Sequence, residues 1–181
     1  ALKSAGHDVN IDCARSLLVE RLASAAELAD SYRVRLAFEP LHPMVCGFRS
    51  IVSTLQESLD ILDQMDDSHD IGLAIDTYAL WWEHDLQEKL KRAGRRILNY
   101  HVSDWLADTR DLRLDRGMPG DGQIALCDWR HMIEAAGYFG PIEVEIFSRD
   151  RGWKAPAETM IEQIIPRMTS AFSKSCTEQL R

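Results

Sequence analysis

Ile71-Gly-Leu-Ala-Ile-Asp76 is a short apolar run with strand character that ends in an acid. Three further runs end in an acid or an imidazole, and they read Arg35-Leu-Ala-Phe-Glu39, Ile97-Leu-Asn-Tyr-His101 and Ile142-Glu-Val-Glu145. Helix-like stretches separate the runs, and strands that alternate with helices are typical of a parallel sheet with right-handed crossover connections. Parallel strands bring their terminal side chains to the same edge of the sheet.

Helical periodicity fills the segments around these strands. Asp12 is the expected N-cap of the first helix, the Ser53-Thr-Leu-Gln56 stretch has the form of a capping box, and Gly94 is expected to end the third helix. The predicted helices cover residues 12–32, 53–65, 85–93, 128–136 and 155–172.

The closed form of this pattern is the eight-stranded barrel, which takes about 250 residues. This chain has 181 residues and four βα units. We therefore expect an α/β fold of the TIM-barrel type, of which the chain holds the C-terminal four βα units and a preceding helix. Residues 1–181 are expected to form a single domain, with tails at 1–10 and 174–181. Four strands alone leave two open edges, so we expect a homo-oligomer or a missing N-terminal half that completes the barrel.

Composition restricts the classes of function. The chain is 45% apolar and 28% charged, which is ordinary for a globular protein, and its formal charge of −8 argues against a nucleic-acid partner. No apolar run approaches the roughly 20 residues of a membrane span. The four cysteines form no Cys-x-x-Cys pair, so neither a zinc knuckle nor a disulfide framework is indicated. We expect a soluble, cytoplasmic protein that acts on a small molecule, without nucleic acid or membrane as a partner.

Three carboxylates and one imidazole at strand ends suit a divalent metal ion. The separations between Glu39, Asp76, His101 and Glu145 are each compatible with one βα unit of about 30 residues. Mixed oxygen and nitrogen donors favour Mn²⁺, Mg²⁺, Co²⁺ or Zn²⁺. A single acid at a strand end often caps a helix, but four residues on the same kind of boundary favour a joint site. Glu143 shares the strand face of Glu145 and is a rival ligand; it is expected instead to form a buried pair lower in the barrel.

Five motifs, in order along the chain, resemble the sugar phosphate isomerase/epimerase family with its xylose-isomerase-like barrel. They are Phe38-Glu-Pro-Leu-His-Pro43, Ile75-Asp-Thr-Tyr-Ala-Leu-Trp-Trp82, His101-Val-Ser-Asp-Trp105, Asp115-Arg-Gly-Met-Pro-Gly-Asp-Gly122 and Ile142-Glu-Val-Glu-Ile-Phe-Ser148. The resemblance extends from about residue 10 to 172. It implies that Glu39, Asp76, His101 and Glu145 bind one divalent metal ion, and that Glu39 and Glu145 also act as catalytic acid and base.

The resemblance implies a metal-dependent isomerase or epimerase of a small sugar or related keto-polyol. The cation polarises the carbonyl, one carboxylate removes the proton from the neighbouring carbon, and the metal-stabilised enediolate is then reprotonated. Two alternatives stay open. One is an inosose-type dehydratase, which uses the same metal-enolate chemistry, and the other is a truncated, non-catalytic barrel fragment.

The chain departs from the family pattern at two places. The family often has a histidine three residues after the Asp ligand, whereas this chain has Ala79, which leaves substrate contact from that strand open. The related apurinic endonucleases use a histidine there and an Asp-x-His pair where this chain reads Asp115-Arg116-Gly117. Two ligands of their three-zinc site are absent, so DNA cleavage is not expected.

Three further residues are candidates for substrate binding. Arg116 is expected to clamp a substrate hydroxyl, carboxylate or phosphate, because a guanidinium offers two parallel donors. The alternative for Arg116 is an ion pair with Asp115 or Asp121. His42 and Trp105 are expected to border the substrate pocket.

Overall fold

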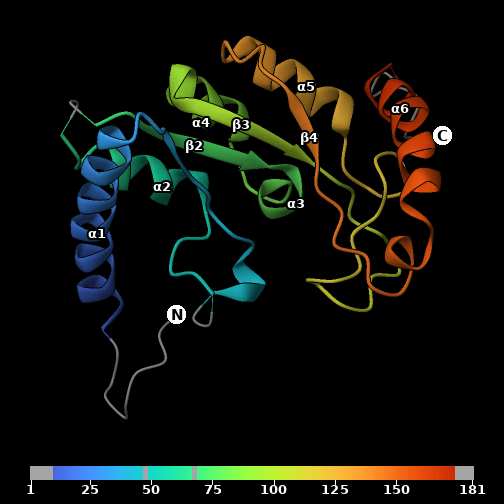
Figure 1. Ribbon diagram of the computed structural model, residues 1–181, viewed down its shortest axis with the longest axis horizontal. Coiled ribbons are helices and arrows are strands. Elements are labelled where there is room, and N and C mark those ends of the chain that lie inside the picture. Colours follow the sequence, from blue (N-terminus) through green and yellow to red (C-terminus); the bar gives the residue numbers. More distant parts are fainter. Residues whose placement is uncertain (1–9, 47–48, 67–68, 174–181) are drawn as a thin grey trace.

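Four parallel strands form a sheet in the order β1-β2-β3-β4 in the computed structural model (Figure 1). The structure describes residues 10–46, 49–66 and 69–173, so the tails predicted at 1–10 and 174–181 lie outside the described residues, except for Asn10. Each neighbouring pair of strands is parallel, which confirms the predicted topology. The strands are β1 (Leu36–Phe38), β2 (Ile71–Asp76), β3 (Ile97–Val102) and β4 (Ile142–Val144).

Helices connect the strands and pack side by side, α2 against α4, α4 against α5, and α5 against α6. In the part of the chain that the structure describes, no helix combines the length and apolar character needed to cross a membrane. The helices are α1 (Ile11–Ser31), α2 (Leu55–Leu62), α3 (Thr77–Leu80), α4 (Leu86–Ala93), α5 (Leu126–Ala135) and α6 (Ala157–Ser173), with short 3-10 segments η1 (Pro43–Val45), η2 (Gly94–Arg96) and η3 (Gly152–Lys154).

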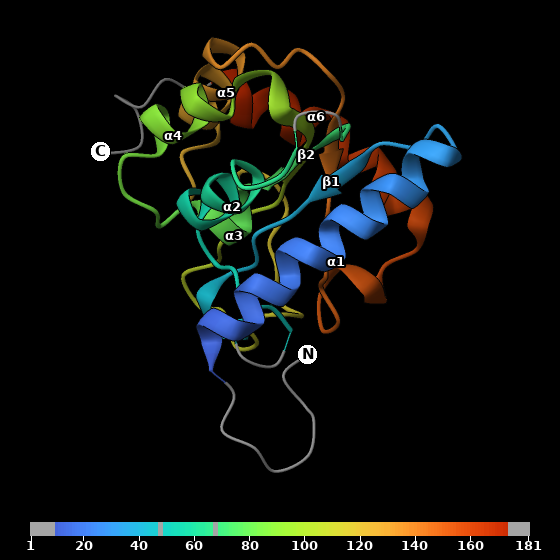
Figure 2. The same cartoon turned by 90° about the vertical axis from the view of Figure 1, so that its left-hand side faces the viewer.

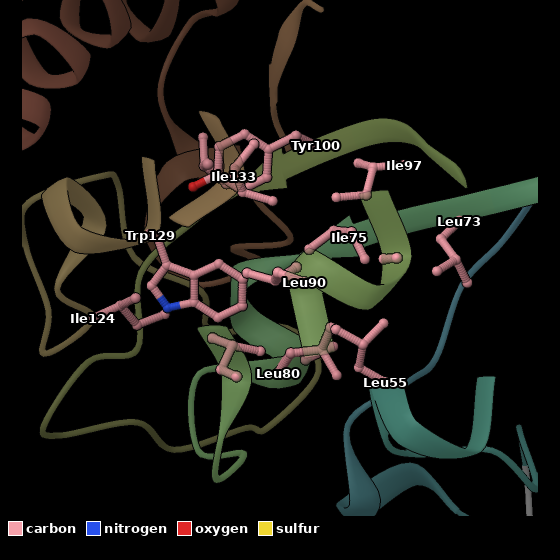
Figure 3. Packing of buried hydrophobic residues seen from close by; sticks show 14 of the residues in the cluster. Leu55, Leu73, Ile75, Leu80, Leu90, Ile97, Tyr100, Ile124, Trp129 and Ile133 are labelled. Carbon is pink, nitrogen blue, oxygen red and sulfur yellow. The ribbon is translucent and has the colours of Figure 1, made fainter. Parts of the chain in front are cut away.

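The hydrophobic core lies between the sheet and this row of helices (Figure 3). Leu73 and Ile75 of β2 are fully buried in it, as are Tyr100 and Val102 of β3. Burying one such side chain contributes about 1.5–3 kcal/mol. Side chains alternate along a strand, so the intervening residues of both strands project from the opposite face of the sheet. The helices contribute Leu55, Leu59, Leu86, Leu90, Leu126, Trp129 and Ile133 to the core.

The start signals of two helices differ from those predicted. Asn10, rather than Asp12, is the N-cap of α1, and its side chain accepts hydrogen bonds from two backbone N–H groups of the first turn. Thr54 is the N-cap of α2, and its capping box closes with Glu57 rather than Gln56. Asp12 lies instead in the first turn of α1, where a negative charge is favourable next to the helix N-terminus.

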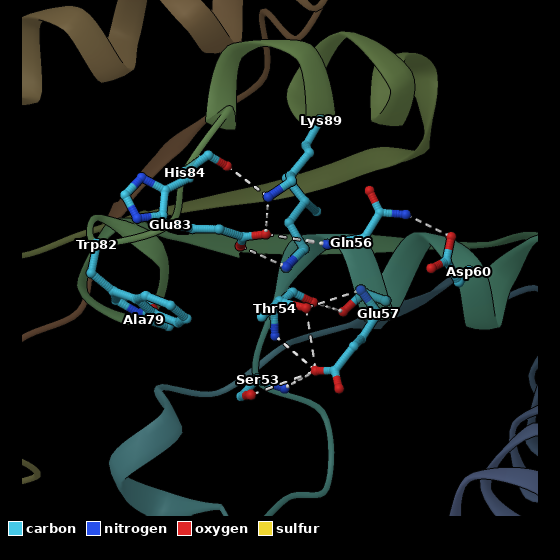
Figure 4. A network of polar contacts seen from close by, with 12 residues as sticks. Ser53, Thr54, Gln56, Glu57, Asp60, Ala79, Trp82, Glu83, His84 and Lys89 are labelled. Atoms are coloured by element: carbon cyan, nitrogen blue, oxygen red, sulfur yellow. Dashed lines mark hydrogen bonds and ion pairs between the residues drawn. The ribbon is translucent and has the colours of Figure 1, made fainter. Parts of the chain in front are cut away.

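Glu83 fixes the loop after α3 between two helices (Figure 4). Its carboxylate accepts a hydrogen bond from the backbone N–H of Leu55, at 2.8 Å, and so satisfies a free donor at the start of α2. Lys89 of α4 donates to the same carboxylate at 2.8 Å and to the carbonyl oxygen of His84 at 2.6 Å. The Glu83 side chain is only 3% exposed, so this network is shielded from water.

Candidate metal centre

The four predicted ligands stand at the C-terminal ends of four adjacent strands. Asp76 is the last residue of β2 and pairs in register with His101 of β3. Glu39 and Glu145 directly follow β1 and β4. The backbone N–H of Glu145 donates to the carbonyl oxygen of Val102 at 3.0 Å, which continues the pairing of β4 with β3 by one residue. The sheet therefore brings all four side chains to one edge, as the sequence predicts.

Glu39, His101 and Glu145 converge on one another. One ligand atom from each lies within 4.8 Å of the others, and the side chains are partly buried. His101 Nδ1 lies 3.6 Å from Glu39 Oε1 and 4.0 Å from Glu145 Oε2. These separations are too long for hydrogen bonds, so the contacts between the three side chains are electrostatic.

These three residues fit a divalent ion. His101 Nδ1 is buried, has no hydrogen-bond partner and faces the two carboxylates. A buried polar atom without a partner costs about 1–3 kcal/mol, which ligation would recover. Carboxylate oxygen and imidazole nitrogen are donors that Mn²⁺, Co²⁺ and Zn²⁺ accept. The two carboxylates and the unpartnered His101 Nδ1 are therefore suitable ligands for a divalent metal ion.

The clustered charges shift the titration of the site. The negative charge of the nearby Glu39 carboxylate raises the pKa of His101 more than desolvation lowers it. Burial raises the pKa of Asp76 to about 6, even though the Arg116 guanidinium opposes the change. Glu39 and Glu145 raise both pKa values further. The sheet edge therefore holds a surplus of negative charge that a cation would neutralise.

Asp76 lies outside the group of three and contacts a guanidinium instead. Its side chain is 1% exposed, and one carboxylate oxygen accepts a hydrogen bond from the backbone N–H of Tyr78 at 2.9 Å. The other oxygen, Oδ2, lies 2.9 Å from Arg116 Nη1. The same nitrogen lies 3.0 Å from Glu145 Oε2. Asp76 is therefore joined to the cluster through a protein cation, and its role as a metal ligand stays a prediction.

Arg116 is held in place by aromatic rings as well as by carboxylates. Its guanidinium carbon lies 4.5 Å from the centre of the Tyr78 ring and 5.0 Å from that of Phe147. Both distances lie within the range of cation–π attraction. Arg116 does not pair with Asp115 or Asp121, so that alternative is wrong. Each of these acids pairs with another arginine, Arg151 or Arg167.

His42 and Trp105 lie against the same aromatic cluster. The His42 ring stacks on Trp105 at a centroid distance of 5.1 Å, and Trp105 stacks on Tyr78 at 4.8 Å. His42 Nδ1 accepts a hydrogen bond from the backbone N–H of Met44, which leaves the ring proton on Nε2. Burial lowers the pKa of His42, and the Arg116 charge lowers it further, so the ring is a neutral donor.

The structure corrects the expectation for Glu143. Its side chain is 56% exposed rather than buried, and it accepts a hydrogen bond from the Asn99 amide at 2.8 Å. Glu143 Oε2 lies 3.9 Å from His101 Nε2, on the other side of the imidazole from the cluster. The prediction assumed a closed barrel around this face, whereas no element among the described residues buries this side chain.

Two residues beside the site could not be identified from the residues at strand ends alone. Tyr78 and Phe147 support Arg116, and both lie inside motifs whose other members were singled out. Ala79, where the family often has histidine, is buried in α3, and its carbonyl oxygen accepts a hydrogen bond from the Trp82 indole at 2.7 Å. The sequence signal for Tyr78 and Phe147 is their position, since each aromatic residue follows a predicted metal ligand by two positions.

A cavity of about 520 Å³ opens beside Glu39, between α1 and β1. Figure 2 shows α1 running alongside β1 at one edge of the sheet. This volume falls within the range of small-molecule sites. Its lining is mainly apolar and includes Leu17, Leu18, Phe38, Leu41 and Ile51.

Comparisons with known proteins agree with this architecture. The family model described as xylose isomerase-like TIM barrel matches residues 3–169. The crystal structure of protein SMc04130 from Sinorhizobium meliloti 1021 is 45% identical in sequence, with a TM-score of 0.87, and the match covers 92% of this chain and 60% of that chain. The sequence is not significantly similar to any curated protein.

Two more distant structures share the fold. The IOLI protein with a bound zinc atom is 23% identical, with a TM-score of 0.77, over 94% of this chain and 60% of that chain. D-psicose 3-epimerase, determined in the presence of D-fructose, is 16% identical, with a TM-score of 0.70, over 93% of this chain and 59% of that chain. The chain thus spans about 60% of the length of these structures.

Proposed function

The chain belongs to the xylose isomerase-like TIM barrel family, and we propose that it forms the catalytic half of a divalent-metal-dependent isomerase or epimerase. The proposed substrate is a small sugar or a related keto-polyol. The observation that carries the proposal is the convergence of Glu39, His101 and Glu145 within 4.8 Å at the sheet edge. The IOLI structure with its zinc atom and the D-psicose 3-epimerase structure determined in the presence of D-fructose support the same assignment by similarity of fold.

Glu39 and Glu145 are the proposed acid and base. A divalent ion held by Glu39, His101 and Glu145, and joined by Asp76, would polarise a substrate carbonyl and the adjacent hydroxyl. The Glu39 and Glu145 side chains are 30% and 33% exposed, so both carboxylates can reach a bound molecule. They follow the two outer strands of the sheet. One carboxylate can remove a proton next to the carbonyl, and the other can return it.

Arg116, His42 and Trp105 are the proposed substrate-binding residues. With Asp76 and Glu145 engaged by a metal ion, the Arg116 guanidinium would be free to donate to a substrate oxygen. The neutral His42 ring offers its Nε2–H as a further donor. Trp105 supplies the aromatic surface on which His42 rests. This combination of donors and a ring face suits a polyhydroxylated molecule.

We propose that four more strands complete the barrel, from a second copy or from a longer protein. Among the residues that the structure describes, β1 and β4 each pair with one strand, so both sheet edges are open. Exposed edges of this kind favour association with another strand. The relatives are longer than this chain, which agrees with a missing half. We further propose a cytoplasmic location, since the described cysteines are free thiols.

The proposal is tested by hydrogen exchange into substrate. The protein, loaded with Mn²⁺, is incubated with a panel of ketoses in D₂O, and deuterium is located by NMR. We expect deuterium on the carbon next to the carbonyl, with an isomer or epimer as product. Loss of water from the substrate would indicate the dehydratase. Bound metal without any exchange would contradict catalysis and support the inert fragment.

The Glu39→Gln and Glu145→Gln variants serve as the chemical controls. Each removes one proposed proton-transfer group while keeping the size of the side chain. We expect both to abolish deuterium incorporation. Exchange at the wild-type rate in either variant would remove that carboxylate from the proposed pair.

A further inference from the structure

Asp104 is a fully buried acid that the proposed chemistry does not use. Its Oδ1 accepts hydrogen bonds from the backbone N–H groups of Trp105, at 2.9 Å, and Ile124, at 3.0 Å. Its Oδ2 accepts from the N–H of Gly120 at 2.9 Å. Within the described residues, no lysine, arginine or histidine forms an ion pair with it. Backbone donors therefore satisfy this carboxylate, and two of the three, the N–H groups of Gly120 and Ile124, come from a loop distant in sequence.

The loop that surrounds Asp104 also carries Arg116. The backbone of Asp104 exchanges two hydrogen bonds with Gly117, at 3.0 and 2.9 Å. The backbone N–H of Gln123 donates to the carbonyl oxygen of Trp105 at 3.0 Å. Arg116 immediately precedes Gly117, so the position of the Arg116 side chain depends on the hydrogen bonds that hold this loop against Asp104.

Gly122 shows how closely the loop approaches the acid. A Cβ atom at this position would lie 2.3 Å from the Trp105 carbonyl oxygen and 2.4 Å from Asp104 Oδ1. Both distances are below any normal contact, so only glycine permits the approach. The close packing of the loop against the Asp104 carboxylate therefore requires glycine at position 122.

We propose that Asp104 is a positioning residue that fastens the loop over 117–124 to the end of β3 and thereby holds the Arg116 guanidinium at the metal centre. β3 also carries His101, three residues before Asp104. One strand end would then set the position of a metal ligand and of the guanidinium beside it. The inference depends on the proposed function in one respect, namely that Arg116 belongs to a site that binds metal and substrate.

A purely structural role would predict something different. A buried carboxylate that only stabilises the fold would affect metal affinity independently of Arg116. A positioning residue acts through Arg116, so its effect should vanish once Arg116 is removed. Residues that belong to one network show this kind of coupling, whereas independent sites do not.

The test is a double-mutant cycle on Mn²⁺ affinity, measured by calorimetry on the full protein. Arg116→Gln removes a cation from the carboxylates, and we expect tighter Mn²⁺ binding. Asp104→Asn replaces one acceptor oxygen with an NH₂ group, which cannot accept a hydrogen bond from a loop N–H. We expect it to tighten Mn²⁺ binding by about threefold in the wild type and to have no effect in the Arg116→Gln background. Equal effects in both backgrounds would overturn the proposal.

A second readout needs no metal. The Arg116 Nε atom is buried, so its N–H should give an NMR signal that is slow to exchange with water and is missing in Arg116→Gln. We expect Asp104→Asn to accelerate exchange of that signal, and of the Gly120 and Ile124 amides, by at least about tenfold. Unchanged exchange at Arg116 would refute the positioning role. If the wild type binds no Mn²⁺, the metal proposal fails while this readout still decides the role of Asp104.

Two further variants control for folding and for charge. Asp121→Asn lies in the same loop, but its exposed side chain pairs with Arg167, so it should leave both readouts unchanged. Gly122→Ala disturbs the same contact from the other side without altering the acid. It should reproduce both effects of Asp104→Asn, and it carries the test if the Asp104 variant does not fold. A wild-type result for Gly122→Ala would argue against the proposal.

Discussion

Arg116 Nη1 lies 2.9 Å from Asp76 Oδ2, so a protein cation occupies a carboxylate that was predicted to bind metal. The same nitrogen also contacts Glu145. A divalent ion must therefore compete with the guanidinium for these oxygens. We predict that Arg116→Gln binds Mn²⁺ about tenfold more tightly, which corresponds to about 1.4 kcal/mol. Calorimetric titration measures the change.

The control for this prediction is Arg149→Gln. Arg149 pairs with Asp111 and Asp150 on the surface, and such exposed pairs contribute little. Its removal changes the net charge equally but should leave Mn²⁺ affinity unchanged. A similar gain in both variants would mean that the overall charge of the protein, and not the Arg116 contact, sets the affinity.

Metal affinity should rise with pH between about pH 5 and 8. The pKa of Asp76 is raised to about 6, and the pKa of His101 is raised above its ordinary value. In the metal-free protein both groups thus keep their protons to higher pH than usual. A cation must displace those protons, so binding weakens as the pH falls through these pKa values. Titrations in buffers of different ionisation enthalpy count the protons released, and binding that is independent of pH would exclude this linkage.

The Glu145→Gln and Glu143→Gln variants form a matched pair on one strand face. Glu145 belongs to the cluster with Glu39 and His101, whereas Glu143 is exposed and bonded to Asn99. We predict that Glu145→Gln weakens Mn²⁺ binding by at least about tenfold, because a charged ligand becomes a neutral amide. Glu143→Gln should bind as the wild type does. The reverse order would transfer the ligand role to Glu143.

His42 should contribute to substrate binding through its Nε2–H. Asn at this position can still accept the Met44 N–H bond but lacks the outer donor, whereas Gln can place an N–H₂ group near that donor. We predict that His42→Asn raises the KM for the converted ketose by about tenfold, equal to about 1.4 kcal/mol, and that His42→Gln restores part of the loss. Steady-state kinetics with unchanged metal content provide the measurement. An unaltered KM in both variants would exclude the ring from the pocket.

Glu83 should stabilise the fold without affecting the metal centre. Glu83→Gln weakens the contacts to the Leu55 N–H and to Lys89 inside a shielded network. We predict a loss of about 1–3 kcal/mol in the free energy of unfolding, measured by urea denaturation. Glu88→Gln, at an exposed ion pair with Lys91, should change stability by less than about 0.5 kcal/mol. Equal losses in the two variants would mean that burial does not strengthen the Glu83 contacts.

The strands and the acids and histidine at their ends could be predicted because both depend on local pattern. β2 begins and ends at the predicted residues, and β3 extends one residue past His101. The alternation of side chains along each strand then decides which face the ligands share. The helix starts are less certain from sequence, since Asn10 and Asp12 are both good N-caps and only the folded backbone selects one.

The partners of long side chains could not be predicted from the same pattern. Arg116 reaches Asp76 because the loop over 104–117 folds back against the segment that follows β4. There the backbone N–H of Arg116 donates to the carbonyl oxygen of Phe147 at 3.0 Å. Nothing local distinguishes that outcome from a pair with neighbouring Asp115. The exposure of Glu143 was missed for a related reason, since it depends on whether a second half of the barrel covers that face.

Metal binding by the wild type and by His101→Ala tests the site most directly. The protein is freed of metal with a chelator, titrated with Co²⁺ and followed by visible absorption and calorimetry. We predict one ion per chain in the wild type. We predict that His101→Ala weakens binding by about a hundredfold, because losing a residue that binds the metal directly has a larger effect than losing an outer-shell partner. Equal Co²⁺ binding by both proteins, or none by the wild type, would contradict a metal centre at Glu39, His101 and Glu145.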